Sequence, residues 1–237
     1  MTETTHDNVQ ITVNDDQFDA YLARPDKSSQ GAPKGGIVVI QEIFGVNEDI
    51  KQTANWLAGE GYWALAPDLF WRQERNVSLS DGSEEEWQKA FALMTGYDGD
   101  EGIGDIQAAI DYLRAAGCAK VGTIGFCLGG RMVYLAACRT NGDAHASYYG
   151  VGIQDMLGEA DNITAPTLIH IAAQDEFVPK PAQAAIADGL ADHELVDVHI
   201  YDGQDHAFAR HNGMHYDAAA SQLAHGRTLE IFAKALS

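Results

Sequence analysis

One cysteine in the sequence stands where a catalytic nucleophile would be exposed. Cys127 lies in the pattern Gly125-x-Cys127-x-Gly129-Gly130, and this pattern follows the predicted buried strand 121–124. The flanking glycines leave room for a sharp strand-to-helix turn with a strained central residue. At the helix N-terminus that follows, the dipole favours a thiolate and any anion formed beside it. The pattern therefore predicts a nucleophile elbow. The alternative is an inert, buried cysteine at a glycine-rich junction.

An acid and a histidine follow the cysteine in a chain order that a catalytic triad can use. Asp175 and His206 each come after a predicted strand. In such a triad the thiol attacks, the imidazole exchanges protons, and the carboxylate holds the imidazole in one tautomer and orientation. The order nucleophile, acid, histidine is that of α/β-hydrolases. Asp202 and Asp205 are local rivals for the role of the acid.

Glu42 is the fourth polar residue at the end of a predicted strand. It follows the apolar run 37–40, which is typical of a strand buried on both faces. Taken singly, Glu42 could be an ion-pair partner, Asp175 a turn residue and His206 a surface histidine. Ligands of open α/β sheets bind outside the carboxyl ends of the strands. We therefore expect these residues and Cys127 to meet at one edge of the sheet.

The elements that must position these residues alternate between strand and helix. Predicted strands are an antiparallel hairpin (9–13 and 18–22), then 37–40, 62–66, 121–124, 146–149, 167–171 and 196–201. Predicted helices are 47–59, 106–116, the segment after Cys127, 180–190 and 216–236. This alternation predicts an α/β fold with a doubly wound, mostly parallel sheet and helices on both faces. Because no repeat or linker interrupts it, residues 1–237 are expected to form a single domain.

The segment 68–104 departs from the alternation. Trp87, Phe91 and Met94 recur in it at helical spacing, which predicts an amphipathic helix. The glycine-rich stretch Gly96–Gly104 is expected to form the end of the segment. Because long insertions of this kind usually cover a functional site, we expect 68–104 to be a cap.

Composition limits the partners and the compartment. The 237 residues are 46% hydrophobic and carry a formal net charge of −20. That charge disfavours nucleic acid and anionic membranes as partners. Three cysteines without disulfide-framework spacing suggest a reducing compartment. With neither a signal peptide nor a long apolar run, we expect a cytoplasmic protein that acts on a small molecule as a monomer or weak homo-oligomer.

Metal and nucleotide chemistry are not indicated. His211 and His215 are four residues apart, but no third ligand or HExxH context accompanies them. The glycines of 122–130 match neither GxGxxG nor a GK[ST] phosphate loop. The sequence therefore predicts neither a metal nor a cofactor.

The chain closely resembles the dienelactone hydrolases (carboxymethylenebutenolidases) over essentially its whole length. The matching segments are 41–47, 66–69, 122–130, the loop around Asp175, and 206–210. The motifs Gln-Glu-Ile-Phe-Gly and Gly-Phe-Cys-Leu-Gly-Gly within them are specific. The resemblance implies an α/β-hydrolase fold and a triad of Cys127, His206 and Asp175.

The resemblance also implies roles for residues around the triad. Glu42 would regulate the thiol, so that the thiolate forms only when substrate rearranges this carboxylate. Arg210 would contact Glu42 and the carboxylate of the substrate. The backbone N–H groups of Leu128 and Ile43 would form the oxyanion hole.

One position departs from the family pattern. The family's second carboxylate-binding arginine aligns with Trp87 in this chain, and Arg72, or Arg75 beside it, is expected to serve instead. The residues expected to contact substrate are therefore Arg210, Arg72, Phe44, Trp87 and Phe91.

Three functional hypotheses follow. The leading one is hydrolysis of an activated ester or lactone that carries a carboxylate, through an acyl-enzyme on Cys127. The second is a general carboxylesterase or thioesterase whose apolar acyl pocket is built by Trp71, Trp87 and Phe91. The third is a non-catalytic binding or redox-sensing protein with a reactive thiol, against which the ordered histidine and acid argue.

Overall fold

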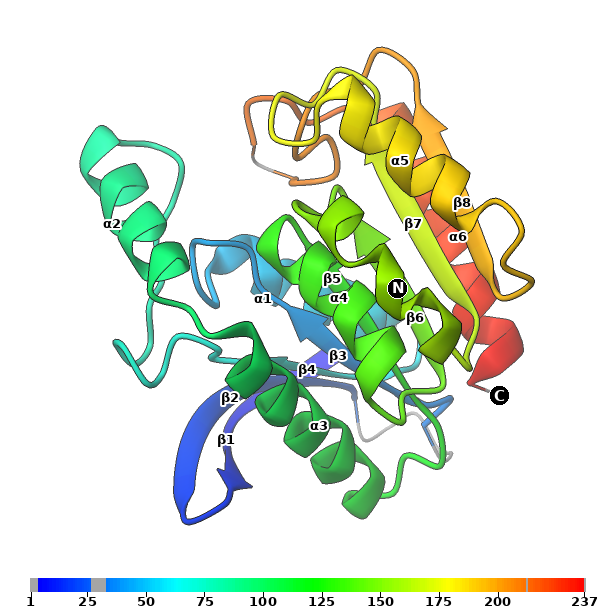
Figure 1. The fold of residues 1–237 in the computed structure, drawn as a ribbon. Coiled ribbons are helices and arrows are strands. Elements are labelled where there is room, and N and C mark those ends of the chain that lie inside the picture. The colour runs from blue at the N-terminus through cyan, green and yellow to red at the C-terminus, as the bar shows by residue number, and fades with distance from the viewer. Residues whose placement is uncertain (1–3, 27–32, 212, 237) are drawn as a thin grey trace.

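Eight strands form the central sheet of the structure. The computed structural model describes residues 4–26, 33–211 and 213–236. The strands are β1 Thr4–Val13, β2 Asp16–Pro25, β3 Gly36–Ile40, β4 Trp63–Pro67, β5 Val121–Phe126, β6 Ala144–Tyr148, β7 Thr167–Ala172 and β8 Val196–Tyr201. Their order across the sheet is β1-β2-β4-β3-β5-β6-β7-β8 (Figure 1). The pairs β1–β2 and β2–β4 are antiparallel and the remaining neighbours are parallel. The predicted mostly parallel sheet is confirmed.

Helices cover both faces of this sheet. They are α1 Glu48–Gly59, α2 Glu84–Thr95, α3 Gly99–Ala115, α4 Leu128–Arg139, α5 Lys180–Leu190 and α6 Ala218–Ala235, with short 3₁₀ turns at Ile153–Asp155 and Leu157–Asn162. α3, α4 and α5 lie on one face, and α1 and α6 on the other (Figure 1). Among the described residues, no helix combines the length and apolar character needed to cross a bilayer.

The apolar run 37–40 lies in β3, which is buried on both faces of the sheet. Val38 and Ile40 pack with the layer of α3 and α4, whereas Ile37 and Val39 pack with the layer of α1 and α6. All four side chains are fully buried. Because successive side chains of a strand point to opposite faces, a strand covered on both sides must be apolar throughout. β3 therefore anchors both layers beneath the candidate site.

Two helices, α2 and α3, occupy most of the predicted cap segment. α2 matches the predicted amphipathic helix and projects beyond the sheet at the upper left of Figure 1. α3 begins at Gly99. Most of the glycine-rich stretch Gly96–Gly104 therefore belongs to a helix. The Asp98 side chain accepts hydrogen bonds from the N–H groups of Asp100 and Glu101. This cap starts the helix despite the low helix propensity of glycine.

Gly129, in the first turn of α4, lets that helix lie directly on the end of β3. A Cβ atom at this position would come within 2.5 Å of the carbonyl oxygen of Gln41, and nearer still to that of Ile40. Cβ atoms do not approach backbone atoms so closely in packed proteins. The absence of a side chain at Gly129 therefore sets the separation between the start of α4 and the segment that follows β3.

Replacing Gly129 with alanine should destabilise the protein by about 1–3 kcal/mol, because α4 and β3 must move apart to accept the added methyl group. Gly104→Ala is the matched control, since Gly104 is a helical glycine with open space around its Cβ position. That control should be neutral or stabilising by up to about 1 kcal/mol. Urea unfolding measures both variants, and wild-type stability in Gly129→Ala would contradict the close contact.

Candidate active site

Cys127 occupies the turn between β5 and α4 in a strained backbone conformation. Its φ is 55° and its ψ is −113°, and it is the N-cap residue of α4. Its N–H donates to the carbonyl of Tyr148 at 3.1 Å, and its own carbonyl accepts from the N–H of Arg131 at 3.2 Å. Non-glycine residues adopt such conformations only where the surrounding structure enforces them, often at active sites. This is the geometry of a nucleophile elbow.

His206 and Asp175 meet beside this turn. The Nδ1 atom of His206 lies 2.7 Å from Oδ2 of Asp175, and both residues are buried. The other carboxylate oxygen of Asp175 accepts hydrogen bonds from the N–H groups of Phe177 and Val178, at 2.8 and 3.2 Å. Asp175 is therefore held rigidly and fixes the orientation of the imidazole, the task of the acid in a triad. The rival Asp202 is exposed.

The surroundings of His206 favour its protonated form. Burial by itself lowers the pKa of this imidazole. The charge of Cys127, the hydrogen bond to Asp175 and a side-chain hydrogen bond to Cys127 outweigh burial, and they raise the pKa to about 10. The imidazole lies between the sulfur of Cys127 and the carboxylate of Asp175, so its protonated form can stabilise a thiolate and hold a proton for a leaving group.

Glu42 forms a buried ion pair with Arg210. Nε of Arg210 donates to Oε2 of Glu42 at 2.7 Å, and its NH1 group donates to Oδ2 of Asp81, also at 2.7 Å. Burial lowers the pKa of the Arg210 guanidinium, but the Glu42 and Asp81 carboxylates reverse this and raise it. Arg210 therefore remains a cation that joins the end of β3 to the cap segment.

The position of Asp81 depends on contacts between the cap segment and the loop after β3. Gly45 and Ser78 form an isolated bridge, and Asn47 donates from its side chain to the carbonyl of Leu79 at 3.0 Å. Gly45 has a φ of 77°, a conformation open to glycine, and a side chain there would collide with Val77. These contacts hold the cap loop against the site, so the acid that precedes α2 reaches Arg210.

The predicted oxyanion donors lie on two adjacent segments. Leu128 is the first residue of α4, where N–H groups have no partner within the helix. Ile43 follows β3, against which the first turn of α4 packs at Gly129. Both residues are buried, 3% exposed each. The structure brings these two backbone segments together beside Cys127, and their role as an oxyanion hole stays a prediction.

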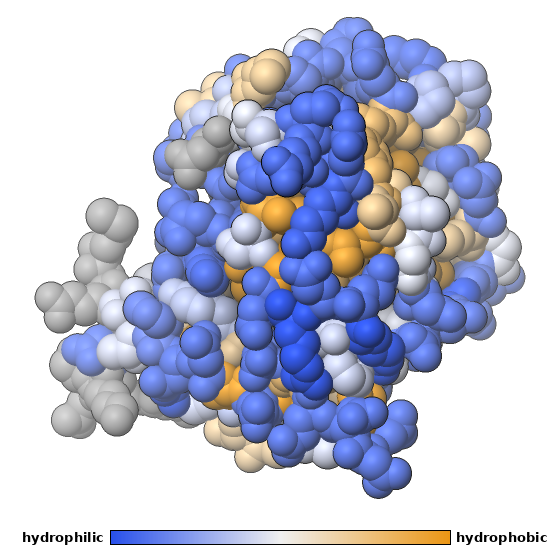
Figure 2. Space-filling model, turned by 90° about the vertical axis from the view of Figure 1, so that its left-hand side faces the viewer, coloured by the Kyte–Doolittle hydropathy of each residue, from blue (hydrophilic) through white to orange (hydrophobic). Residues whose placement is uncertain are grey.

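An aromatic wall connects Arg210 with the cap helix. The Arg210 guanidinium lies 5.1 Å from the centre of the Phe44 ring, which meets Trp87 edge to face at 5.0 Å. Trp87 stacks on Phe91 at 5.4 Å. On the α2 side of the molecule, apolar residues gather in a hollow around a polar ridge (Figure 2). Of the residues expected to contact substrate, Arg210, Phe44, Trp87 and Phe91 thus form one chain of contacts, in which Phe91 is 39% exposed and Phe44 only 1%.

Arg72 lies apart from that surface. Its guanidinium forms two hydrogen bonds with the buried carboxylate of Asp105 on α3, at 2.5 and 3.1 Å, and an ion pair with Glu101. The indole N–H of Trp71 also donates to Asp105. Arg72 is therefore engaged in holding the cap segment to α3, and its expected contact with substrate finds no support in this placement.

Three residues at the site were not singled out from the sequence. Phe177 packs edge to face on the His206 ring at 4.8 Å and is 48% exposed, so it lies between His206 and solvent on one side of the candidate triad. Tyr149 also packs edge to face on His206, at 5.0 Å. Asp81 is the third. Tyr149 directly follows β6, so the rule that sites gather at strand ends could have identified it.

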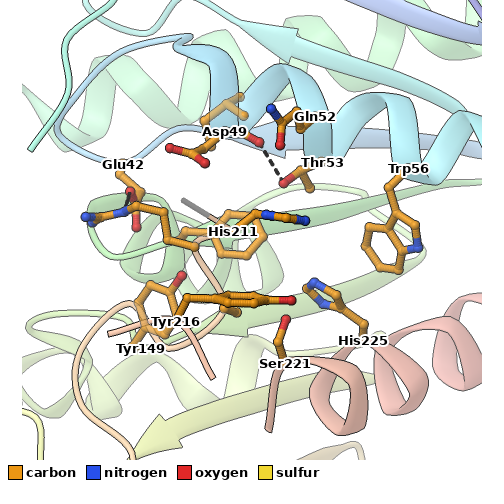
Figure 3. A pocket seen from close by; sticks show the side chains of 14 residues that line it. Glu42, Asp49, Gln52, Thr53, Trp56, Tyr149, His211, Tyr216, Ser221 and His225 are labelled. Atoms are coloured by element: carbon orange, nitrogen blue, oxygen red, sulfur yellow. Dashed lines mark hydrogen bonds and ion pairs between the residues drawn. The ribbon is translucent and has the colours of Figure 1, made fainter. Parts of the chain in front are cut away.

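A cavity of about 200 Å³ lies between α1 and α6, and Glu42 lies at the opposite end of it from Trp56 (Figure 3). Trp56 of α1 and His225 of α6 stack with their ring centres 4.4 Å apart along its wall. None of the three triad residues is among the described residues that line it. The cavity adjoins the candidate triad through the Glu42–Arg210 ion pair and Tyr149, which also line it.

The fold and the site define the class of this protein. An elbow nucleophile on a doubly wound sheet, with an acid and a histidine after later strands, is the arrangement of an α/β-hydrolase. Residues 18–236 match the model of the dienelactone hydrolase family. The chain belongs to that family, and with it to the enzymes that hydrolyse ester and lactone bonds.

Individual relatives agree with this assignment. The chain is 42% identical to a protein of Azospirillum brasilense named "Putative carboxymethylenebutenolidase", with 95% of this chain and 97% of that protein covered. It is 38% identical to a carboxymethylenebutenolidase of Pseudomonas putida, with 91% of each covered. A solved structure titled "Putative Dienelactone Hydrolase", from Klebsiella pneumoniae, superposes with a TM-score of 0.86 at 26% identity, covering 98% of this chain and 99% of that one.

Replacing Asp175 with asparagine should lower kcat by a factor on the order of 10⁴, because an amide no longer fixes the productive tautomer of His206. The same change should lower the pKa of His206, since it removes one of the interactions that raise it. Ester hydrolysis and an NMR titration of the imidazole measure the two effects. Asp202→Asn is the control. A larger loss of activity in that control would assign the role of the acid to the rival residue.

Proposed function

We propose that this enzyme hydrolyses an ester or lactone that carries a carboxylate, through an acyl-enzyme on Cys127. The observation that carries the proposal is the chain of contacts from the strained elbow of Cys127 to His206 and on to Asp175. Nucleophile, base and orienting acid joined in this order are the working parts of a triad hydrolase. Membership of the dienelactone hydrolase family supports the choice of ester and lactone bonds.

Acylation begins with attack by the Cys127 sulfur on the carbonyl carbon. The carbonyl electron pair moves onto oxygen, and the N–H groups of Leu128 and Ile43 are the proposed donors to this oxyanion. When the intermediate collapses, the C–O bond breaks and His206 gives its proton to the departing alkoxide or enolate. The result is a thioester on Cys127 and an alcohol or enol, which remains attached when the substrate is a lactone.

Deacylation uses the same groups in the opposite sense. Neutral His206 takes a proton from water while the hydroxide forms a bond to the thioester carbonyl carbon. Collapse of this second intermediate breaks the C–S bond, releases the acid product and regenerates the thiolate beside the imidazolium. Asp175 keeps the imidazole ring oriented through both halves of the cycle.

The carboxylate of the substrate is proposed to bind Arg210 in place of Asp81. Of the two carboxylates on Arg210, the Asp81 side chain is 28% exposed and that of Glu42 only 4%. The more exposed partner is the easier one to displace, because solvent screens its attraction to Arg210 and hydrates it after release. Contact of Arg210 with an anionic substrate would also weaken its hold on Glu42, which supports the expected regulation of the thiol by this residue.

A general carboxylesterase for apolar acyl groups is the second candidate function. It is favoured by the aromatic wall of Phe44, Trp87 and Phe91 and by the engagement of Arg210 with two carboxylates. A neutral substrate would occupy the wall without disturbing the ion pairs. The free cysteines Cys118 and Cys138 are consistent with a reducing compartment such as the cytoplasm for either enzyme.

A matched pair of aryl esters, one with a free carboxylate and one with that group methylated, tests the proposal. The carboxylated ester should have the higher kcat/KM by about tenfold, the value of one charge-assisted hydrogen bond. A preference for the methylated ester would favour the general carboxylesterase instead.

The variant Asp81→Asn tests the exchange on Arg210 with the same pair of esters. It should lower KM for the carboxylated ester by about tenfold and leave the neutral ester unchanged, because substrate no longer displaces a carboxylate from Arg210. Glu84→Gln is the control, since it removes an equal charge from α2, where Glu84 contacts Gln88. An unchanged KM in Asp81→Asn, or an equal change in Glu84→Gln, would contradict the exchange.

A further inference from the structure

Tyr149 adopts a backbone conformation that needs an explanation. Its φ is 38°, a value uncommon for a residue other than glycine. It directly follows β6, and its N–H donates to the carbonyl of His170 at 2.7 Å. Backbone strain of this kind persists where the structure requires one side-chain position, and it concentrates at functional sites. The side chain of Tyr149 is therefore the place to look for the reason.

The ring of Tyr149 is immobilised by packing. The residue is 1% exposed, and its ring meets His206 edge to face at 5.0 Å and Phe208 at 5.6 Å. The ring of Phe126 lies 6.1 Å away on a further side. Because the ring is enclosed by other rings, the position of its hydroxyl group is fixed.

The hydroxyl group of Tyr149 and one oxygen of Glu42 are both buried without a partner. The Tyr149 hydroxyl has no hydrogen-bond partner among the described residues, and neither has Oε1 of Glu42. Figure 3 shows the hydroxyl directed toward the Glu42 carboxylate. Buried polar groups are nearly always paired, so two neighbouring groups left unpaired need a functional explanation. One is a donor and the other an acceptor.

The adjacent Tyr148 shows the ordinary behaviour of a buried tyrosine in this fold. Its hydroxyl lies 2.7 Å from Oγ1 of Thr228 and 3.0 Å from Nδ1 of His225. Tyr148 is fully buried, as Tyr149 nearly is. The difference between these two neighbours is therefore one of pairing, not of burial.

Burial, helped by the charge of Glu42, keeps the Tyr149 hydroxyl in its donor form. Burial, and after it the charge of Glu42, raises the pKa of Tyr149 well above its ordinary value. The titratable and charged groups that surround Tyr149 and Glu42 are Cys127, Tyr148, His206, Arg210 and Asp81, with Asp49, His211 and His225 across the cavity. Among these, Arg210 is the donor that already holds Glu42.

We propose that Tyr149 is a positioning residue for Glu42, to which its hydroxyl donates a hydrogen bond when Arg210 turns to the substrate. The inference rests on the proposed function, in which an anionic substrate bound to Arg210 weakens its hold on Glu42. A carboxylate that loses its only donor in a buried site takes up a proton more readily and loses its orientation. Tyr149 supplies the replacement donor, which keeps Glu42 ionised and close to the thiol.

The variant Tyr149→Phe removes the hydroxyl and keeps the ring that packs on His206. The pH dependence of kcat reports ionisations in the enzyme–substrate complex, whereas that of kcat/KM reports ionisations in the free enzyme. In Tyr149→Phe the acid limb of the kcat profile should therefore move to higher pH by about one unit. The limb of kcat/KM should move less, since Arg210 still holds Glu42 in the free enzyme. At a pH on the acid side, kcat for the carboxylated ester should fall about tenfold.

Two companion variants make this result specific. Tyr148→Phe removes a buried hydroxyl that faces Thr228 and His225, and it should leave the limb of kcat in place. In a Glu42→Gln background, Tyr149→Phe should cause no further fall in kcat, because the two residues act through one hydrogen bond. An unmoved limb in Tyr149→Phe, an equal movement in Tyr148→Phe, or a full tenfold fall in the Glu42→Gln background would each overturn the inference.

The variant Cys127→Ala, measured alongside, separates this inference from the function on which it rests. Loss of turnover in Cys127→Ala together with an unmoved limb in Tyr149→Phe overturns the role of Tyr149 alone. Retained turnover in Cys127→Ala overturns the proposed function and the inference with it.

Discussion

The contact between the first turn of α4 and the end of β3 is the constraint on which the site depends. It requires a residue without a side chain at Gly129, two positions after the strained turn at Cys127. The same contact places Ile43 and Glu42, which follow β3, beside the nucleophile. A single packing requirement between a helix and a strand thus sets the position of the thiol, of the proposed oxyanion donors and of the proposed regulatory carboxylate.

The charged side chains at the site form two sets. Asp175 and His206 form one, and Glu42, Arg210 and Asp81 form the other. In a protein with a net charge of −20, a single buried guanidinium shared by two acids is a local exception to the prevailing field. That sharing explains how the cap segment, the end of β3 and the loop after β8 can respond together when an anion reaches Arg210.

Sequence reasoning predicted the parts of the candidate site that depend on local pattern. Each of these parts can be predicted from a few residues. They are the apolar run 37–40, the glycines around Cys127, and the order of Asp175 and His206. These signals predicted the sheet, and the structure brings the residues that follow its strands together at one edge. The reason is that parallel strands all present their carboxyl ends at the same edge.

The features that sequence reasoning missed depend on contacts between distant segments. Asp81 reaches Arg210 only because Gly45 and Asn47 hold the cap loop in place, and nothing near Asp81 in the sequence indicates this. Arg72 was expected at the substrate, but its partner Asp105 lies on α3, 33 residues away in the chain. The early start of α3 depended on one capping side chain in a glycine-rich stretch, where helix propensity and capping give opposite signals.

The most direct test of the central claim, that Cys127 carries the acyl group of the substrate, is mass spectrometry of the enzyme quenched with acid during turnover of an aryl ester. The account predicts a mass increase equal to the acyl group, on the peptide that contains Cys127, which disappears as substrate is exhausted. An acyl group on any other residue would contradict the account. So would a burst of product with no acyl group on the enzyme.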